Sequence, residues 1–240
     1  MSQFSALPCL LLAAGRGERM RPLTDELPKP LLKIGSQSLL ERHLNLLSKA
    51  GIKEVVINHA WLGEKIEDAL GDGAQFGLHI EYSREGTALE TAGGIHQALK
   101  LLKPKDYLLV INGDIFCPNF PIEALLEQIS TLRANPAKPL AYLVMAPNPA
   151  QHPNGDFYLK DGLIQDNLSP NAEKLTFSGI GIYHYSLFTH IQSGASAKLA
   201  PLLREAMGKN QVLGEKYLGP WHDVGTPQRL KELNAAYASS

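Results

Sequence analysis

The chain has 240 residues, of which 44% are hydrophobic and 20% charged, with a formal net charge of -1 at pH 7. This is ordinary globular composition with enough chain for a sizeable core, and the balanced charge argues against non-specific binding to nucleic acid or anionic membranes. No apolar run is long enough for a transmembrane helix and residues 1–7 do not read as a signal peptide, so we expect a cytoplasmic protein without a membrane partner.

The first predicted element is a buried strand at 8–13, and it opens into an unusual loop. Gly15 and Gly17 are one residue apart, and three arginines fall within six positions, 16–21. Such a loop is typical of a phosphate cradle, because glycines let backbone N–H groups approach the oxygens and arginines neutralise them. Met20 stands where the dinucleotide fingerprint needs its third glycine, and the P-loop pattern is absent. A basic surface turn is the alternative interpretation.

Helices and strands are then expected to alternate as far as position 111. A helix capped by Ser38 ends near Gly51, and a later helix is expected to have Thr91 as its cap. This rhythm predicts right-handed βαβ units in a parallel sheet, with ligands at the carboxyl ends of the strands. The strands are expected at 54–58, 78–83 and 107–111, and another helix at 62–70.

The second half of the sequence has a mixed pattern. Asp161-Gly162 predicts a hairpin between strands at 156–160 and 163–165. We expect one domain over residues 1–240, with a nucleotide-binding half of about 1–115 and a mixed half of about 116–240 that adds strands to the same sheet. The other expected elements are strands at 140–145 and 177–185 and helices at 122–133, 199–207 and 227–237, the last capped by Thr226.

Two aspartates are candidate metal ligands. Asp114 follows an apolar strand and a glycine, which places a carboxylate at the ligand edge of the sheet; a turn cap is the alternative. Asp223 could complete a magnesium site with Asp114 or form only a salt bridge. The eight histidines lack metal-ligand spacing, and His43 and His96 are expected to be packing or surface residues.

No nucleophile-and-base arrangement is evident elsewhere. Neither a Ser-His-Asp nor a Cys-His pattern is recognisable in the sequence. Cys9 and Cys117 lie beside apolar strand-like runs, so buried, inert thiols are expected.

Several motifs together resemble the signature of the sugar-phosphate nucleotidyltransferases, which join a nucleoside triphosphate to a sugar 1-phosphate. They are the loop at 15–24 followed by Pro28-Lys29-Pro30, then Asn112-Gly113-Asp114 and the segments 177–180 and 221–227. The resemblance implies a three-layer, mostly parallel, Rossmann-like α/β sheet of the nucleotide-diphospho-sugar transferase type, with a mixed sugar-binding lobe. Segments 58–63 and 89–94 are most similar to members that use UTP and N-acetylmuramate 1-phosphate in bacterial cell-wall recycling.

The resemblance also suggests roles for individual residues. It assigns Mg²⁺ to Asp114 and Asp223, and charge stabilisation near the α-phosphate to Lys29. Arg16 and Arg19, with the backbone around them, are expected to hold the β- and γ-phosphates. The catalytic set is therefore Arg16, Arg19, Lys29 and Asp114. The expected nucleotide-binding residues are Ala13, Ala14, Gly15, Gly17, Glu18, Arg19, Lys29, Glu90, Thr91, Gly93, Gly94 and Asn112.

Two points concern the nucleotide base and the sugar. Gly93 and Gly94 either let a flat base approach the backbone or only pack a helix start.

Leu168-Ser169-Pro170 stands where many relatives have Glu-Lys-Pro, which leaves the sugar phosphate to the metal or to Lys174. The sequence identifies no partner for the extra carboxylate of N-acetylmuramate. The expected sugar-binding residues are Gly155, Asp156, Asn167, Ser178 and Gly179.

Other activities remain open alongside uridylyl transfer. One alternative is transfer of a thymidylyl group to glucose 1-phosphate, of a guanylyl group to mannose 1-phosphate or of a cytidylyl group to choline phosphate. Another is a nucleotide-sugar sensor without catalytic activity. Retention of Lys29, Asp114 and Asp223 argues against the sensor. Because the chain lacks the left-handed β-helix or long dimerisation extension of many relatives, a monomer is expected.

Overall fold

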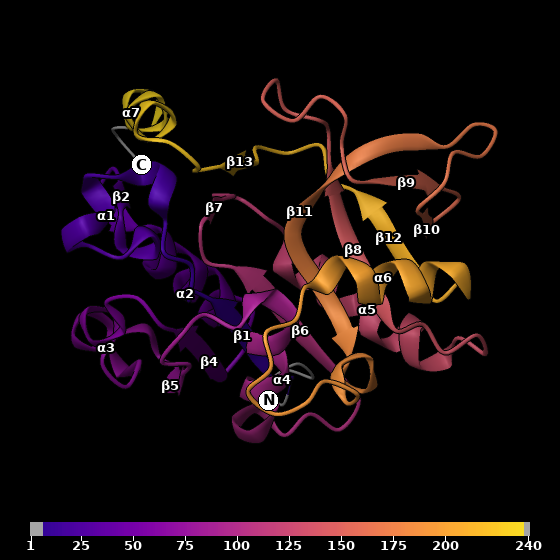
Figure 1. The fold of residues 1–240 in the computed structure, drawn as a ribbon, viewed down its shortest axis with the longest axis horizontal. Helices are drawn as coiled ribbons and strands as arrows, with labels where there is room; N and C mark the ends of the chain where they lie inside the picture. The colour runs from indigo at the N-terminus through magenta and orange to yellow at the C-terminus, as the bar shows by residue number, and fades with distance from the viewer. Residues whose placement is uncertain (1–6, 238–240) are drawn as a thin grey trace.

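The computed structural model describes residues 7–237, which form a nine-stranded sheet between two layers of helices (Figure 1). Its first four strands are parallel, in the order β5, β4, β1 and β6. β1 is short and almost wholly buried, as its apolar Cys-Leu-Leu-Leu sequence predicts. The bounds are β1 Cys9–Leu12, β4 Glu54–His59, β5 His79–Arg84 and β6 Tyr107–Asn112.

The second half adds five strands, and the sheet becomes a mixed one with both parallel and antiparallel pairs. β11 lies antiparallel between β6 and β8, and its far end pairs with β9. It begins at Glu173, four residues before the predicted start, because residues 173–175 find partners in β9. The predicted Rossmann-like α/β sheet with a mixed second half is confirmed. The bounds are β8 Ala141–Ala146, β9 Phe157–Lys160, β10 Leu163–Gln165, β11 Glu173–His184 and β12 Val212–Lys216.

Helices cover both faces of the sheet, which gives the three layers that were predicted. Adjacent residues of β1 face opposite layers: Leu11 lies in the core cluster with α2, α3 and α5, and Leu10 in the cluster with α4 and α6. Among residues 7–237, no helix is both long enough and apolar enough to cross a bilayer. The bounds are α2 Leu39–Lys49, α3 Gly63–Leu70, α4 Glu90–Leu102, α5 Ile122–Ala134 and α6 Leu199–Gly208.

Two helix caps agree with the sequence and one does not. Ser38 forms a reciprocal capping box with Glu41 at the start of α2, and the Thr226 hydroxyl accepts a hydrogen bond from the backbone of α7 (Pro227–Ala236). The prediction that Thr91 caps a helix is wrong, since α4 begins at Glu90. Its first turn instead uses a distant acceptor: the N–H groups of Ala92 and Gly93 donate to the carbonyl of Ala197, at 2.9 and 3.1 Å.

Two very short strands, β7 (Ile115–Phe116) and β13 (His222–Asp223), pair antiparallel beside the main sheet. The pairing holds the segment before α7 against the chain that follows β6. α7 then packs through Leu233 onto a small apolar cluster that includes Met20 and Phe116. These elements lie above the carboxyl ends of the parallel strands (Figure 1).

Both cysteines are buried, as expected. Cys9 is fully buried in β1 and burial strongly raises the pKa of its thiol. Burial raises the pKa of the Cys117 thiol to about 12. Neither group is therefore a ready thiolate nucleophile at neutral pH.

Candidate active site

A cleft of about 700 Å³ lies at the carboxyl ends of β1 and β6. Its walls come from separate segments: the loop after β1, Lys29, the start of α4 and the chain after β6. Most of the residues predicted to bind a nucleotide line it. They are Ala13, Ala14, Gly15, Gly17, Glu18, Arg19, Lys29, Glu90, Thr91 and Asn112, together with Arg16 and Asp114 from the predicted catalytic and metal sets. Their roles stay predictions.

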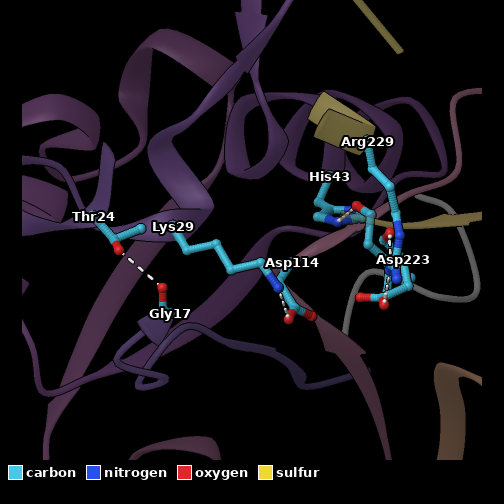
Figure 2. A network of polar contacts seen from close by, with 8 residues as sticks. Gly17, Thr24, Lys29, His43, Asp114, Asp223 and Arg229 are labelled. Carbon is cyan, nitrogen blue, oxygen red and sulfur yellow. Dashed lines mark hydrogen bonds and ion pairs between the residues drawn. The ribbon is translucent and has the colours of Figure 1, made fainter. Parts of the chain in front are cut away.

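The loop after β1 is shaped by glycines that serve different purposes. Gly17 has a positive φ of 67°, and its carbonyl accepts a hydrogen bond of 2.8 Å from the Thr24 hydroxyl (Figure 2). A Cβ on Gly17 would lie 3.1 Å from both Lys29 and Thr24 side-chain carbons. A Cβ on Gly15 would have no atom within 4 Å, so the bare backbone there faces open space in the cleft. Gly17 therefore shapes the turn, and Gly15 leaves room for a ligand.

Arg16 is held in one orientation by three neighbours. Its guanidinium lies 3.4 Å over the ring of Trp61, which follows β4. The carbonyl of Thr24 accepts hydrogen bonds from both Arg16 Nη1, at 3.1 Å, and Trp61 Nε1, at 3.0 Å. Asp25 adds an ion pair at 3.6 Å. Sequence reasoning gave Trp61 no role, although it lies in segment 58–63, which carries part of the resemblance.

Lys29 and Asp114, which both line the cleft, form an ion pair. Lys29 Nζ lies 2.5 Å from Asp114 Oδ2; the lysine side chain is 8% exposed and the aspartate 39% (Figure 2). The nearby His43 is buried on α2, with Nε2 3.2 Å from the Ile115 carbonyl. Burial lowers the pKa of His43 to about 4, so its ring is neutral at pH 7. Because His43 is neutral, the positive charge next to the Asp114 carboxylate comes from the nearly buried Lys29.

Asp223 is brought beside the backbone of Asp114 by the β7–β13 pairing. It lies opposite Ile115, and the N–H of Val224 donates to the Asp114 carbonyl at 3.4 Å. Arg229 Nη1 donates to Asp223 Oδ2 at 2.7 Å (Figure 2). Each aspartate thus uses Oδ2 for its cation, while Oδ1 has no hydrogen-bond partner among residues 7–237.

These two carboxylates suit one particular kind of metal site. Within the described chain no group of three or more His, Cys, Asp and Glu residues is placed to hold an ion. Mg²⁺ commonly takes only one or two carboxylates and completes its shell with water and substrate phosphates. Asp114 lines the cleft and Asp223 lines a neighbouring hollow, and each has the carboxylate chemistry of such a ligand.

Gly93 and Gly94 lie in the protein interior and do not line the cleft. A Cβ on Gly93 would lie 2.5 Å from the Ala195 carbonyl oxygen, and one on Gly94 would lie 2.5 Å from Glu85 Oε1 and 2.6 Å from Asn58 Nδ2. Close packing at both Cβ positions therefore accounts for glycine here, as the packing alternative expects, and a role in binding the base stays a prediction.

Asn58 and Glu85 join the first loop to α4. The Asn58 amide accepts from the N–H of Ala13 at 2.8 Å and donates to Glu85 at 2.5 Å. Glu85 also accepts from the N–H of Leu89 at 2.8 Å, just before the helix. Burial raises the pKa of the Glu85 carboxyl, and the hydrogen bonds from Leu89 and Asn58 oppose this rise. The network fixes both walls of the cleft, and sequence reasoning missed Glu85.

None of the five predicted sugar-binding residues lines the cleft. Asp156 accepts from the N–H of Phe177 at 2.8 Å, and Ser178 is buried and accepts from the N–H of Ile180 at 3.2 Å. Gly179, with φ of 85°, packs on Asn112 of the cleft wall. Gly155 and Asn167 lie in loops of the 116–240 half, outside the cleft lining. The Asp156 carboxylate thus joins the start of β9 to β11, and Ser178 lies within β11 itself.

Comparison with known proteins adds to this geometry. A family model described as nucleotidyl transferase matches residues 9–240. The chain is 48% identical over 231 residues to the N-acetylmuramate alpha-1-phosphate uridylyltransferase of Neisseria meningitidis serogroup B, covering 95% of this chain and 97% of that protein. A protein of the same name from Caulobacter vibrioides is 30% identical over 243 residues, covering 96% and 97%.

Solved structures show the same fold. A Bacillus anthracis protein described as a glucose-1-phosphate thymidylyltransferase, in complex with sucrose, matches with a TM-score of 0.82. The match covers 98% of this chain and 96% of that chain at 19% sequence identity. At that identity the likeness concerns the fold alone.

Proposed function

The chain belongs to the nucleotidyl transferase family, and from this premise we propose that it transfers the uridylyl group of UTP to N-acetylmuramate 1-phosphate. The products are UDP-N-acetylmuramate and pyrophosphate, in the cytoplasmic recycling of peptidoglycan. The observation that carries the proposal is one cleft in which a glycine-arginine loop faces the Lys29–Asp114 pair, with Asp223 beside it. Identity to the Neisseria protein supports the choice of substrates.

The reaction is an in-line displacement at the α-phosphorus of UTP. A phosphate oxygen of the sugar 1-phosphate forms the new P–O bond, and the bond to pyrophosphate breaks. Phosphoryl-group transfer depends mostly on positioning and charge stabilisation, so no protein nucleophile is needed. Lys29 supplies a fixed positive charge near the α-phosphate, because its side chain is nearly buried and paired with Asp114.

The loop after β1 binds the rest of the triphosphate. Arg16, held by Trp61 and Thr24, and Arg19 neutralise the β- and γ-phosphates, while N–H groups around Gly15 donate to their oxygens. Ala13 and Ala14 with the start of α4 receive the base. The 116–240 half holds the sugar, and the chain acts as a monomer with both halves in one domain.

Asp114 and Asp223 hold Mg²⁺ in this proposal. When bound, the ion supplies positive charge to the reacting phosphate oxygens. The contribution of the chain is orientation: Lys29 and Arg229 each take one oxygen of a carboxylate and leave the other available.

Pyrophosphate release tests the proposed activity. The purified protein is assayed with UTP, CTP, dTTP and GTP, each against N-acetylmuramate 1-phosphate, glucose 1-phosphate, mannose 1-phosphate and choline phosphate. We expect UTP with N-acetylmuramate 1-phosphate to exceed every other pair by about tenfold or more, a difference of about 1.4 kcal/mol in the barrier. Equal rates with all triphosphates, or no release at all, would refute the proposal.

A second experiment tests the metal ligand. Asp114→Asn keeps the shape but removes the charge, and loss of several kcal/mol of charge stabilisation should lower kcat/KM by roughly two decades or more. Asp161→Asn is the matched control, since Asp161 lies on the exposed turn between β9 and β10. Wild-type turnover by Asp114→Asn with Mg²⁺ would show that the assigned role is wrong.

A further inference from the structure

A second hollow, of about 390 Å³, lies between α7 and the loop that joins β8 to β9. Its lining includes Trp221, Asp223, Arg229, Glu232 and Tyr237. Asp223 places it beside the cleft, because its pairing partner Ile115 directly follows the cleft residue Asp114. The hollow and the cleft thus adjoin at the segment that carries Asp114 and Asp223, where the sugar phosphate is proposed to bind.

Arg229 is the charged donor in the hollow, and only part of its guanidinium is used. Both of its side-chain hydrogen bonds leave from Nη1, to Asp223 Oδ2 at 2.7 Å and to the Asp223 carbonyl at 3.3 Å. Nε and Nη2 donate to no atom of residues 7–237. Nη1 therefore fixes the guanidinium, while Nε and Nη2 remain as donors for a ligand. The Arg229 side chain is 22% exposed, so a ligand can approach it.

The same two donors bind carboxylates elsewhere in this chain. Arg133 donates through Nε and Nη2 to Asp106, at 2.5 and 2.9 Å, and Arg84 contacts Glu67 in the same way. This planar fork matches the two oxygens of a carboxylate, and the bonds are charge-assisted. The unused edge of Arg229 thus has the chemistry of a carboxylate receptor.

The remaining walls suit a small organic substituent. Trp221 is fixed by a 2.8 Å hydrogen bond from Nε1 to the Ser178 carbonyl, and Tyr237 packs edge-on against Phe116 at 4.9 Å between ring centroids. Two carboxylates also line the hollow: Asp223 is paired with Arg229 Nη1, and Glu232 lies at the exposed rim and accepts from Gln228 at 2.8 Å. Water screens exposed charges, so Glu232 weakens an anion site without abolishing it.

We propose that this hollow receives a carboxylate-bearing side arm of the sugar 1-phosphate and that Arg229 binds the carboxylate through Nε and Nη2. The inference rests on the proposed function, whose sugar differs from N-acetylglucosamine by a lactyl ether that ends in a carboxylate. It makes Arg229 a determinant of sugar specificity, in addition to its contact with Asp223.

Calorimetric binding separates the two roles of Arg229. The ligands are N-acetylmuramate 1-phosphate and its analogue in which the lactyl carboxylate is an uncharged carboxamide. Wild type should bind the acid about tenfold or more tightly than the amide, because a charge-assisted bidentate pair is lost. The dissociation constants of Arg229→Gln for the acid and the amide should lie within about threefold of each other. If the substitution acted only by loosening Asp223, both ligands would bind more weakly by the same factor and the preference for the acid would remain.

Two further variants sharpen the test. Glu232→Gln should tighten binding of the acid by about two- to threefold and leave the amide unchanged, since an exposed like charge is removed. Arg204→Gln is the matched control: Arg204 lies on α6, where its guanidinium pairs with Asp166 outside the hollow, and the acid preference should persist. Melting curves establish that each variant is folded.

The outcomes distinguish this inference from the proposed function. If UTP-dependent pyrophosphate release is observed but wild type binds acid and amide equally, or Arg229→Gln keeps the preference, only the assignment of Arg229 fails. If neither ligand binds and no pyrophosphate is released, the proposed function fails as well.

Discussion

Replacing Trp61 tests whether Arg16 must be held in place to bind the triphosphate. Trp61 provides a ring face 3.4 Å from the Arg16 guanidinium and an Nε1–H that donates to Thr24 at 3.0 Å. Trp61→Leu removes both interactions, and Trp61→Phe keeps an aromatic face but removes the N–H. Because the Arg16 side chain is 32% exposed, its orientation depends on these few contacts.

The magnitude follows from the two contacts. A partly desolvated cation–π pair contributes about 1 kcal/mol, and the indole hydrogen bond contributes about 1 kcal/mol. If all of this is lost from binding, the KM for UTP rises about 30-fold in Trp61→Leu, since about 1.4 kcal/mol corresponds to tenfold. Trp61→Phe should show a rise of about fivefold. The KM for the sugar phosphate should change by less than about twofold.

Initial rates of pyrophosphate release at varied UTP provide the assay. The decisive comparison adds Trp61→Leu to Arg16→Met, a variant that already lacks the guanidinium. If Trp61 acts through Arg16, the second substitution should change the KM for UTP by less than about twofold. Full additivity of the two effects, or a change confined to the sugar phosphate, would refute the reasoning.

Three further predictions concern individual residues. Gly15→Ala should leave the free energy of unfolding nearly unchanged, because its Cβ meets no atom within 4 Å, but should raise the KM for UTP; an unchanged KM would contradict an open ligand face. Gly63→Ala should cost about 2 kcal/mol in urea unfolding, because its Cβ would lie 1.8 Å from His59 Nδ1. A hydrogen bond from Arg133 lowers the pKa of the Asp106 carboxyl below the usual 3.8. The stability that this pair adds to the fold is therefore fully present above pH 3.8 and is lost as the pH falls through the folded pKa. Asp106→Asn should therefore cost about 0.5–1 kcal/mol at pH 7, and the cost should shrink progressively as the pH is lowered below 3.8; a cost that does not change with pH would argue against the pair.

Local signals in the sequence were sufficient for much of the fold. The apolar run of β1 and the helical spacing after Ser38 gave elements that the structure confirms, and Asp161-Gly162 marked the β9–β10 hairpin. These signals work because strand burial, capping and tight turns depend on residues close together in the chain. The loop at 15–19 was likewise visible, since its chemistry lies in adjacent residues that all line the cleft.

The tertiary structure decided the contacts between distant segments. Thr91 does not cap α4 because the Ala197 carbonyl already accepts from its first turn. Gly93 and Gly94 are small because Ala195, Asn58 and Glu85 pack against them. No local pattern could show either fact, since the partners lie elsewhere in the sequence.

The same limit applies to the charged groups of the site. The sequence by itself determined which groups were available: the arginines of the first loop, Lys29 and the two aspartates. Only the folded chain placed Asp223 opposite Ile115 and Trp61 over Arg16. The two-residue strand β13 is too short to show a hydrophobic period in the sequence, and the contact between Trp61 and Arg16 leaves no periodic pattern at all. Both features therefore depend on how the whole chain packs.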